Sequence, residues 1–174
     1  MEIRTINPEV YQAEGPVVWA TRENIEFLKA RALENPRGRA RLCAHPGPGD
    51  SLHEMLVALR RDTAIRPHIH PNNVESVHMI EGLMTVVHFG EDGTIGEAVP
   101  MGDLKSGRAI YYRMTKPLYH SWFPESEVMI CQEVTRGPFN RANTMLAPWA
   151  PEEGPDGKLK EYLDGVRARV LKKS

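Results

Sequence analysis

Short strand-like segments separated by turn signals fill the middle of this chain and restrict its fold more than any other feature. From Arg39 to Phe139, runs of β-branched and other apolar residues alternate with clusters of proline, glycine, asparagine and aspartate. The predicted strands are 53–60, 63–70, 75–81, 83–90, 94–99, 108–114 and 127–135. This density of short strands is typical of a β-sandwich or a β-barrel.

One helix is predicted on each side of the strand region. Thr21 is a suitable N-cap for the first, and Asn35-Pro36-Arg37-Gly38 ends it. Its apolar stripe is Ile25, Leu28, Ala32 and Leu33. The second helix has a stripe of Leu159, Tyr162, Leu163, Val166 and Val170, which indicates packing onto the barrel or across a dimer. We therefore predict one domain with three parts: an N-terminal extension (1–38), a barrel (39–139) and a C-terminal tail with a helix (140–174).

Charge and hydropathy exclude several classes of function. The chain has 22 basic and 23 acidic residues among 174, so nothing indicates a nucleic-acid partner or a membrane surface. Its start lacks the apolar segment of a secretion signal, and its apolar runs are too short to span a membrane. Cys43 and Cys131 lie in apolar runs without metal-binding spacing, which favours buried, reduced thiols. We expect a cytoplasmic protein.

The strongest chemical signal is the segment His68-Ile69-His70-Pro71-Asn72-Asn73-Val74-Glu75. Side chains two apart on a strand share a face, about 7 Å apart along it, so His68 and His70 can bind one ion. Pro71 and the two asparagines predict a turn that returns Glu75 beside them. Two imidazoles and a carboxylate are the ligands of catalytic zinc and non-haem iron sites.

This spacing, with Gly82 after the following strand, resembles the first signature motif of the cupins. The resemblance implies an all-β fold, the cupin double-stranded β-helix or jelly-roll barrel, with the two helices added. It also implies a fourth metal ligand, a histidine from a later strand. The second cupin motif is not reproduced here, so His120 is chosen by its position in the chain.

Other segments resemble the WbuC family of cupin metalloproteins. They are Arg41-Leu42-Cys43 with His45, the run from Leu52 to Leu59, the turn from Phe89 to Gly93, and the stretches from Glu133 to Phe139 and from Ala147 to Glu153. That family is associated with bacterial O-antigen sugar gene clusters. The resemblance implies a fold and a metal more directly than a reaction.

Three functions remain open at this point. One is a metal-dependent enzyme acting on a small polar substrate such as a sugar or nucleotide sugar, by isomerisation or epimerisation. The second is an Fe(II)-dependent dioxygenase with the same ligands, and the third is a non-catalytic small-molecule binding protein. The ligand set accepts zinc, iron, manganese, nickel or cobalt, so we expect one divalent transition metal.

The sequence also provides candidates for proton transfer. Glu133 stands in the apolar strand after His120, where an unpaired carboxylate is costly to bury and its pKa would rise. It faces either solvent or the barrel interior. Tyr112 is the alternative, a phenol that could donate to a developing oxyanion.

The remaining histidines have structural interpretations. His78 should face away from Glu75, on the outer side of its strand, and His88 reads as a core histidine. We expect His53 at the mouth of the barrel, and His45 either in a surface loop or in contact with the substrate. His78, Ile80 and the C-terminal stripe offer apolar surface for a homodimer.

Overall fold

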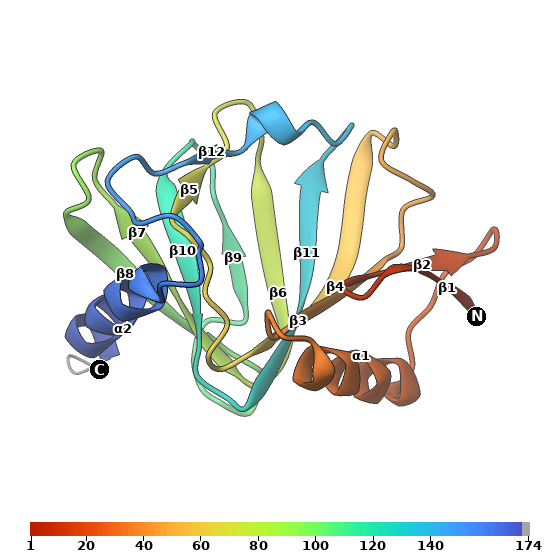
Figure 1. The fold of residues 1–174 in the computed structure, drawn as a ribbon. Helices are drawn as coiled ribbons and strands as arrows, with labels where there is room; N and C mark the ends of the chain where they lie inside the picture. Colours follow the sequence, from red (N-terminus) through yellow and green to blue (C-terminus); the bar gives the residue numbers. More distant parts are fainter. Residues whose placement is uncertain (172–174) are drawn as a thin grey trace.

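Two β-sheets face one another in the computed structural model, which describes residues 1–171 (Figure 1). The larger sheet has the order β1-β2-β3-β4-β11-β6-β9. Its strands are β1 (Glu2–Asn7), β2 (Val10–Glu14), β3 (Arg39–Cys43), β4 (Leu52–Arg60), β6 (Glu75–Glu81), β9 (Tyr111–Arg113) and β11 (Val128–Arg136). The smaller sheet, β12-β5-β10-β7-β8, contains β5 (His68–Ile69), β7 (Leu83–Phe89), β8 (Ile95–Gly102), β10 (Tyr119–Pro124) and β12 (Met145–Leu146).

The strand order identifies the fold. The eight consecutive strands from β4 to β11 form two four-stranded groups, β4-β11-β6-β9 and β5-β10-β7-β8. This interleaving of two Greek keys is the jelly roll. The predicted cupin double-stranded β-helix with an N-terminal and a C-terminal helix is therefore confirmed. β1, β2 and β3 extend the larger sheet beyond the barrel, and β2 joins β3 in parallel.

The barrel interior is one apolar cluster that separates the inner from the outer face of each strand. It contains Met55, Val57, Val77, Met79, Met84, Val86, Trp122, Met129 and Cys131, among others. Because strand side chains alternate, residues of the same parity on these strands also face inward. Both Cys43 and Cys131 belong to this cluster as buried free thiols, as the sequence indicated.

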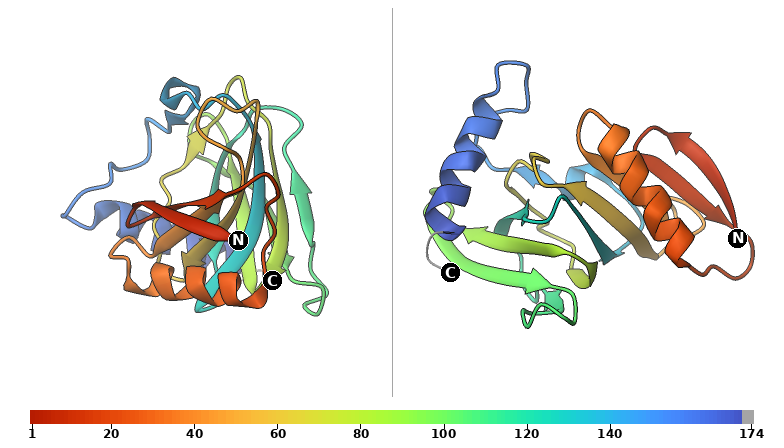
Figure 2. Two further views of the ribbon diagram at one scale, coloured as in Figure 1. Left: turned by 90° about the vertical axis from the view of Figure 1, so that its right-hand side faces the viewer. Right: turned by 90° about the horizontal axis from the view of Figure 1, so that it is seen from below.

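The two helices cover the outer faces at opposite ends of the molecule (Figure 2). α1 (Arg22–Glu34) buries Leu28 and Ala32 against Leu42, Ala58 and Ile130 of the larger sheet. Full burial of a leucine side chain stabilises the fold by about 1.5–3 kcal/mol. α2 (Lys158–Val170) packs its predicted stripe against Val87, Phe89 and Phe123 of the smaller sheet.

The N-cap of α1 is as predicted, but its apolar stripe is shorter. The Thr21 backbone N–H donates to Asn24 Oδ1 at 2.9 Å and forms one half of a capping box. Leu33, which the helical period assigned to the stripe, is 45% exposed. A single-turn 3-10 helix, η1 (Arg141–Asn143), precedes β12. None of the helices in residues 1–171 has both the length and the apolar character needed to cross a bilayer.

Some predicted strands are shorter in the structure. Within 63–70 only His68 and Ile69 pair as a strand, because Pro67 and Pro71 lack the N–H that continues a ladder. Segment 108–114 pairs only over Tyr111–Arg113. Neither β3 nor β10 is among the strands predicted from the sequence, although β10 carries His120.

Gly82 joins β6 to β7 with φ +83°, a left-handed conformation that glycine adopts without strain. A Cβ built there would lie 2.9 Å from Ser126 Oγ and 3.2 Å from the Val128 carbonyl oxygen. The glycine of the motif thus allows close packing between the β6–β7 turn and the start of β11.

Candidate metal centre

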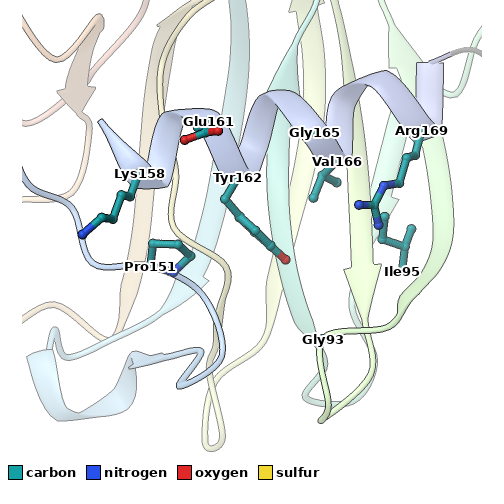
Figure 3. A pocket seen from close by; sticks show the side chains of 9 residues that line it. All are labelled: Gly93, Ile95, Pro151, Lys158, Glu161, Tyr162, Gly165, Val166 and Arg169. Atoms are coloured by element: carbon teal, nitrogen blue, oxygen red, sulfur yellow. The ribbon is translucent and has the colours of Figure 1, made fainter. Parts of the chain in front are cut away.

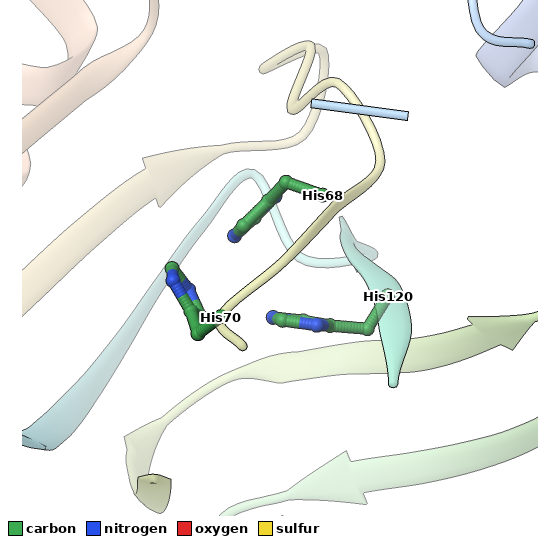
Figure 4. Close-up of side chains that lie close together, drawn as sticks. All are labelled: His68, His70 and His120. Atoms are coloured by element: carbon green, nitrogen blue, oxygen red, sulfur yellow. The ribbon is translucent and has the colours of Figure 1, made fainter. Parts of the chain in front are cut away.

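Three histidines from the smaller sheet point toward one another inside the barrel (Figure 4). His68 on β5 and His120 on β10 are directly paired across neighbouring strands, and His70 follows β5 immediately. Their ligand atoms all lie within 4.8 Å of one another. His120 is fully buried, and the His68 and His70 rings are half-buried. The structure therefore brings together the three histidines that the sequence selected.

Glu75 joins this cluster from the larger sheet. It begins β6 and is 3% exposed, with Oε2 3.6 Å from His70 Nε2 and Oε1 3.7 Å from His120 Nε2. These separations are too long for hydrogen bonds. Two ligand atoms that each lie about 2.1 Å from one ion are about 3.0–3.4 Å from each other. The two separations seen here are a few tenths of an ångström longer. Only a small adjustment would bring these oxygen and nitrogen atoms onto one ion.

The main chain sets the orientation of each imidazole. His68 Nδ1 lies 3.0 Å from the Arg66 carbonyl oxygen, and His120 Nδ1 lies 3.0 Å from that of Leu118. His70 Nδ1 lies 3.3 Å from the Asn143 carbonyl oxygen. Since a carbonyl only accepts, Nδ1 carries the proton in each ring and Nε2 keeps its lone pair. Metal-binding histidines are oriented in this way by their outer partners.

Two buried polar atoms at the centre of the cluster have no hydrogen-bond partner within the described residues. They are Glu75 Oε1 and His120 Nε2, which face each other. Leaving such atoms unsatisfied costs about 1–3 kcal/mol each, so buried polar atoms normally have a partner. A divalent cation between them would satisfy both, and the donor set of three imidazoles and one carboxylate fits such an ion.

The protonation states also suit a cation. Burial lowers the pKa of His68 to about 4 and lowers the pKa of His70. Burial would also lower the pKa of His120, but the Glu75 carboxylate outweighs it and the pKa is raised. Burial would raise the pKa of Glu75, yet the three imidazoles lower it. His68 and His70 are therefore neutral at neutral pH and Glu75 is ionised, while His120 would give up its proton to a cation that takes the proton's place beside Glu75.

Glu133 lies on the inner face of the barrel, not toward bulk solvent. It shares that face with Met129 and Cys131, and it pairs with Val77 of β6 and Met55 of β4, all members of the interior cluster. Burial, reinforced by the charge of Glu75, raises the pKa of Glu133 to about 8. Glu133 therefore holds a proton at neutral pH.

Tyr112 also faces inward, and it has a partner that the sequence did not reveal. Its hydroxyl lies 2.6 Å from His88 Nε2, and burial raises the pKa of the phenol. The inward direction of His88 follows from its parity with Met84 and Val86 on β7. That parity was available in the sequence, but the pairing of β7 and β9 residues across the barrel was not.

The other histidines lie outside the cluster. His78 is exposed on the outer face of β6, as predicted, and its ring lies 4.6 Å from that of Tyr111. His53 is buried and stacks on His45, with ring centroids 4.0 Å apart. His45 Nδ1 lies 3.0 Å from the Glu54 carbonyl oxygen, so this pair organises the loop before β4.

A separate hollow of about 440 Å³ lies outside the barrel, between α2 and the β7–β8 turn (Figure 3). Tyr162, Val166 and Ile95 form part of its wall. Its cationic residues, Lys158 and Arg169, stand at opposite ends of α2, about 16 Å apart along the axis. These two cations do not converge on one point, so the histidine cluster remains the candidate centre.

Comparisons with known proteins give a limited result. Residues 20–101, a little under half of the chain, match the family described as Domain of unknown function (DUF6016). No curated protein matches the sequence.

Several solved structures are similar at low identity. The dimethylsulfoniopropionate (DMSP) lyase DddQ from Ruegeria pomeroyi is 18% identical over 66% of this chain and 54% of its own, with a TM-score of 0.47. Protein SO0799 from Shewanella oneidensis is 13% identical over 59% and 66%, with a TM-score of 0.47. A mutant of the Bacillus subtilis oxalate decarboxylase OxdC is 20% identical over 56% and 24%, with a TM-score of 0.39. The chain thus spans less than two thirds of each, and the fold assignment rests on its own strand order.

Proposed function

We propose that this chain is a divalent-metal-binding cupin that acts on a small polar substrate by proton transfer, as an isomerase or epimerase does. The observation that carries the proposal is the meeting of two different groups in one barrel. His68, His70, His120 and Glu75 present a ligand set, and the protonated Glu133 lies on the same inner face. The resemblance to the WbuC family supports a sugar or nucleotide sugar as the substrate.

These four residues would hold the metal, which would supply a Lewis acid for a substrate carbonyl or hydroxyl. The chain's own residues then move the proton. Glu133, with a pKa of about 8, can donate a proton at neutral pH and take it back afterwards. The apolar residues Met55 and Val77, its cross-strand partners, limit the water around that carboxyl group.

Metal analysis followed by a substrate panel tests the proposal. Protein purified without added metal should contain one divalent transition metal per chain. In deuterated water, a nucleotide-sugar panel should then show exchange of a carbon-bound proton by nuclear magnetic resonance (NMR). Glu133→Gln should retain the metal and lower the exchange rate by about 10²–10⁴. Glu127→Gln is the matched control, because Glu127 is exposed just before the same strand.

The same measurements separate the two alternatives. Iron with oxygen uptake on the panel would favour a dioxygenase, whereas a redox-inert metal excludes it. Saturable binding without exchange or oxygen uptake would favour a non-catalytic binding protein. We also propose a cytoplasmic location, which the two buried free thiols support because reduced thiols persist in that compartment.

A further inference from the structure

A hydrogen bond crosses the barrel interior between His88 and Tyr112. His88 belongs to β7 in the smaller sheet, and Tyr112 belongs to β9 in the larger one. His88 Nε2 and the Tyr112 hydroxyl oxygen are 2.6 Å apart. Tyr112 is 8% exposed and the His88 side chain is 12% exposed, so little water competes for this bond. The bond therefore holds the phenol in one orientation.

The pair lies beside the candidate metal ligands. His88 is the direct cross-strand partner of His120 on β10. Tyr112 is paired with Val77, which lies two residues from Glu75 on the inner face of β6. A substrate bound at the ligand cluster would therefore have the phenol among its neighbours.

His88 is held differently from the three candidate ligands. Each ligand bonds a main-chain carbonyl through Nδ1 and turns Nε2 toward the cluster. His88 instead turns Nε2 to Tyr112, and the acidic group nearest its Nδ1 is the exposed Glu97 carboxylate, 4.0 Å away. A carboxylate attracts an N–H and repels a lone pair, so it favours the proton on Nδ1. Nε2 then accepts, and the Tyr112 hydroxyl donates.

This direction determines what Tyr112 can do. A phenol has one proton, and His88 already accepts it. Toward the rest of the interior Tyr112 presents only oxygen lone pairs, which accept a proton. The oxyanion-donor role expected from the sequence would require the opposite direction.

We propose that His88 is a positioning residue that makes Tyr112 the general base of this site. The inference rests on the proposed function, in which Glu133 is the acid, and it assigns Tyr112 as the base of the same reaction. In the step, a substrate C–H or O–H bond breaks and its proton bonds to the Tyr112 oxygen. The original phenolic proton moves to His88 Nε2, and the electron pair stays on the substrate. His88 becomes an imidazolium near Glu97, and the reverse transfers restore both groups.

The direction of the hydrogen bond can be measured on the metal-loaded protein without a substrate. Long-range proton–nitrogen NMR on protein with nitrogen-15 histidine should show His88 with Nδ1 protonated and Nε2 bare. A slowly exchanging tyrosine hydroxyl proton should be present, and it should be absent in both Tyr112→Phe and His88→Phe. A protonated Nε2 in neutral His88 would overturn the proposal.

Kinetics test the positioning role. His88→Phe and Tyr112→Phe should each lower kcat by about 10²–10⁴ with little change in KM, and the double variant should be no slower than the slower single one. His88→Gln keeps an oxygen that can accept the phenolic hydrogen bond but cannot take up its proton, so it should restore the slowly exchanging hydroxyl signal and leave kcat low. All four variants should keep the metal. His78→Phe, at an exposed histidine on the outer face, is the control.

The outcomes separate this inference from the proposed function. Two outcomes would overturn the inference and leave the proposed function standing, provided that the wild type turns over a substrate. One is an unchanged kcat in His88→Phe, and the other is a loss of kcat in the double variant equal to the product of the two single losses. Absence of turnover on the whole panel with the metal bound would overturn the proposed function and the base role together.

Discussion

Glu133 on β11 lies diagonally across from Glu75 on β6, and both carboxyl groups are on the inner face of the barrel. The register fixes this relationship, because Glu133 pairs with Val77 and Thr135 pairs with Glu75. Two carboxylates this near in a poorly solvated interior disfavour double ionisation. The imidazoles stabilise the charge on Glu75, so the proton remains on Glu133, whose pKa rises to about 8.

The stability of the metal-free protein should therefore depend on pH through Glu133. Between pH 4.5, its ordinary pKa, and about 8, folded Glu133 holds a proton that the unfolded chain releases. Stability from this group is present below pH 4.5 and is lost as the pH rises through about 8. In thermal unfolding, the stability of Glu133→Gln relative to wild type should increase as the pH rises across this window. Above about pH 8 the stability difference between the two proteins should stay constant. A pH-independent difference would place Glu133 in water.

His70→Ala should abolish stoichiometric metal binding and leave the β-sheet circular-dichroism signal intact. His70 follows β5 and is not a member of the apolar interior cluster, so replacing it removes a ligand and little packing. His78→Ala, on the outer face of β6, should keep full metal content by elemental analysis. Unchanged metal in His70→Ala would contradict the ligand assignment.

Gly82→Ala should destabilise the fold more than Gly107→Ala. Both glycines have a left-handed φ, +83° and +71°, which costs alanine about 1–2 kcal/mol. At Gly82 the added Cβ would also displace Ser126 Oγ, which accepts the Leu83 N–H at 2.9 Å, whereas Gly107 has open space. Urea unfolding should show a loss of about 2–3 kcal/mol for Gly82→Ala and about 1–2 kcal/mol for Gly107→Ala. Equal losses would mean that Ser126 moves at no cost.

Light scattering at micromolar concentration should give about twice the 19.6 kDa mass of one chain. The surface that would be buried includes Ile80 and Tyr111, which are 42% and 46% exposed on the outer face of β6 and β9. Ile80→Lys should shift the mass toward the monomer. A monomeric mass for wild type would reject the homodimer.

Sequence reasoning predicted best where a residue's role depends on local spacing. His68, His70 and Glu75 come together because strand periodicity and one turn are local properties. His120 required knowledge of which strands are neighbours, and the cupin resemblance supplied it. The direction of Glu133 depends on which strand face is inner, and only the packing of Cys131 and Met129 beside it decides that. The His88–Tyr112 bond joins two sheets, so no local pattern could reveal it.

The carbonyl groups that orient the three imidazoles belong to the main chain of Arg66, Leu118 and Asn143. A substitution at any of these positions replaces a side chain and keeps the carbonyl. Substitutions at these positions therefore leave the tautomers of the three imidazoles unchanged as long as the strands keep their register. In such a barrel, the side chains that contact a substrate can change during evolution while the metal ligands keep their orientation, so new specificities can arise around the same ligand set.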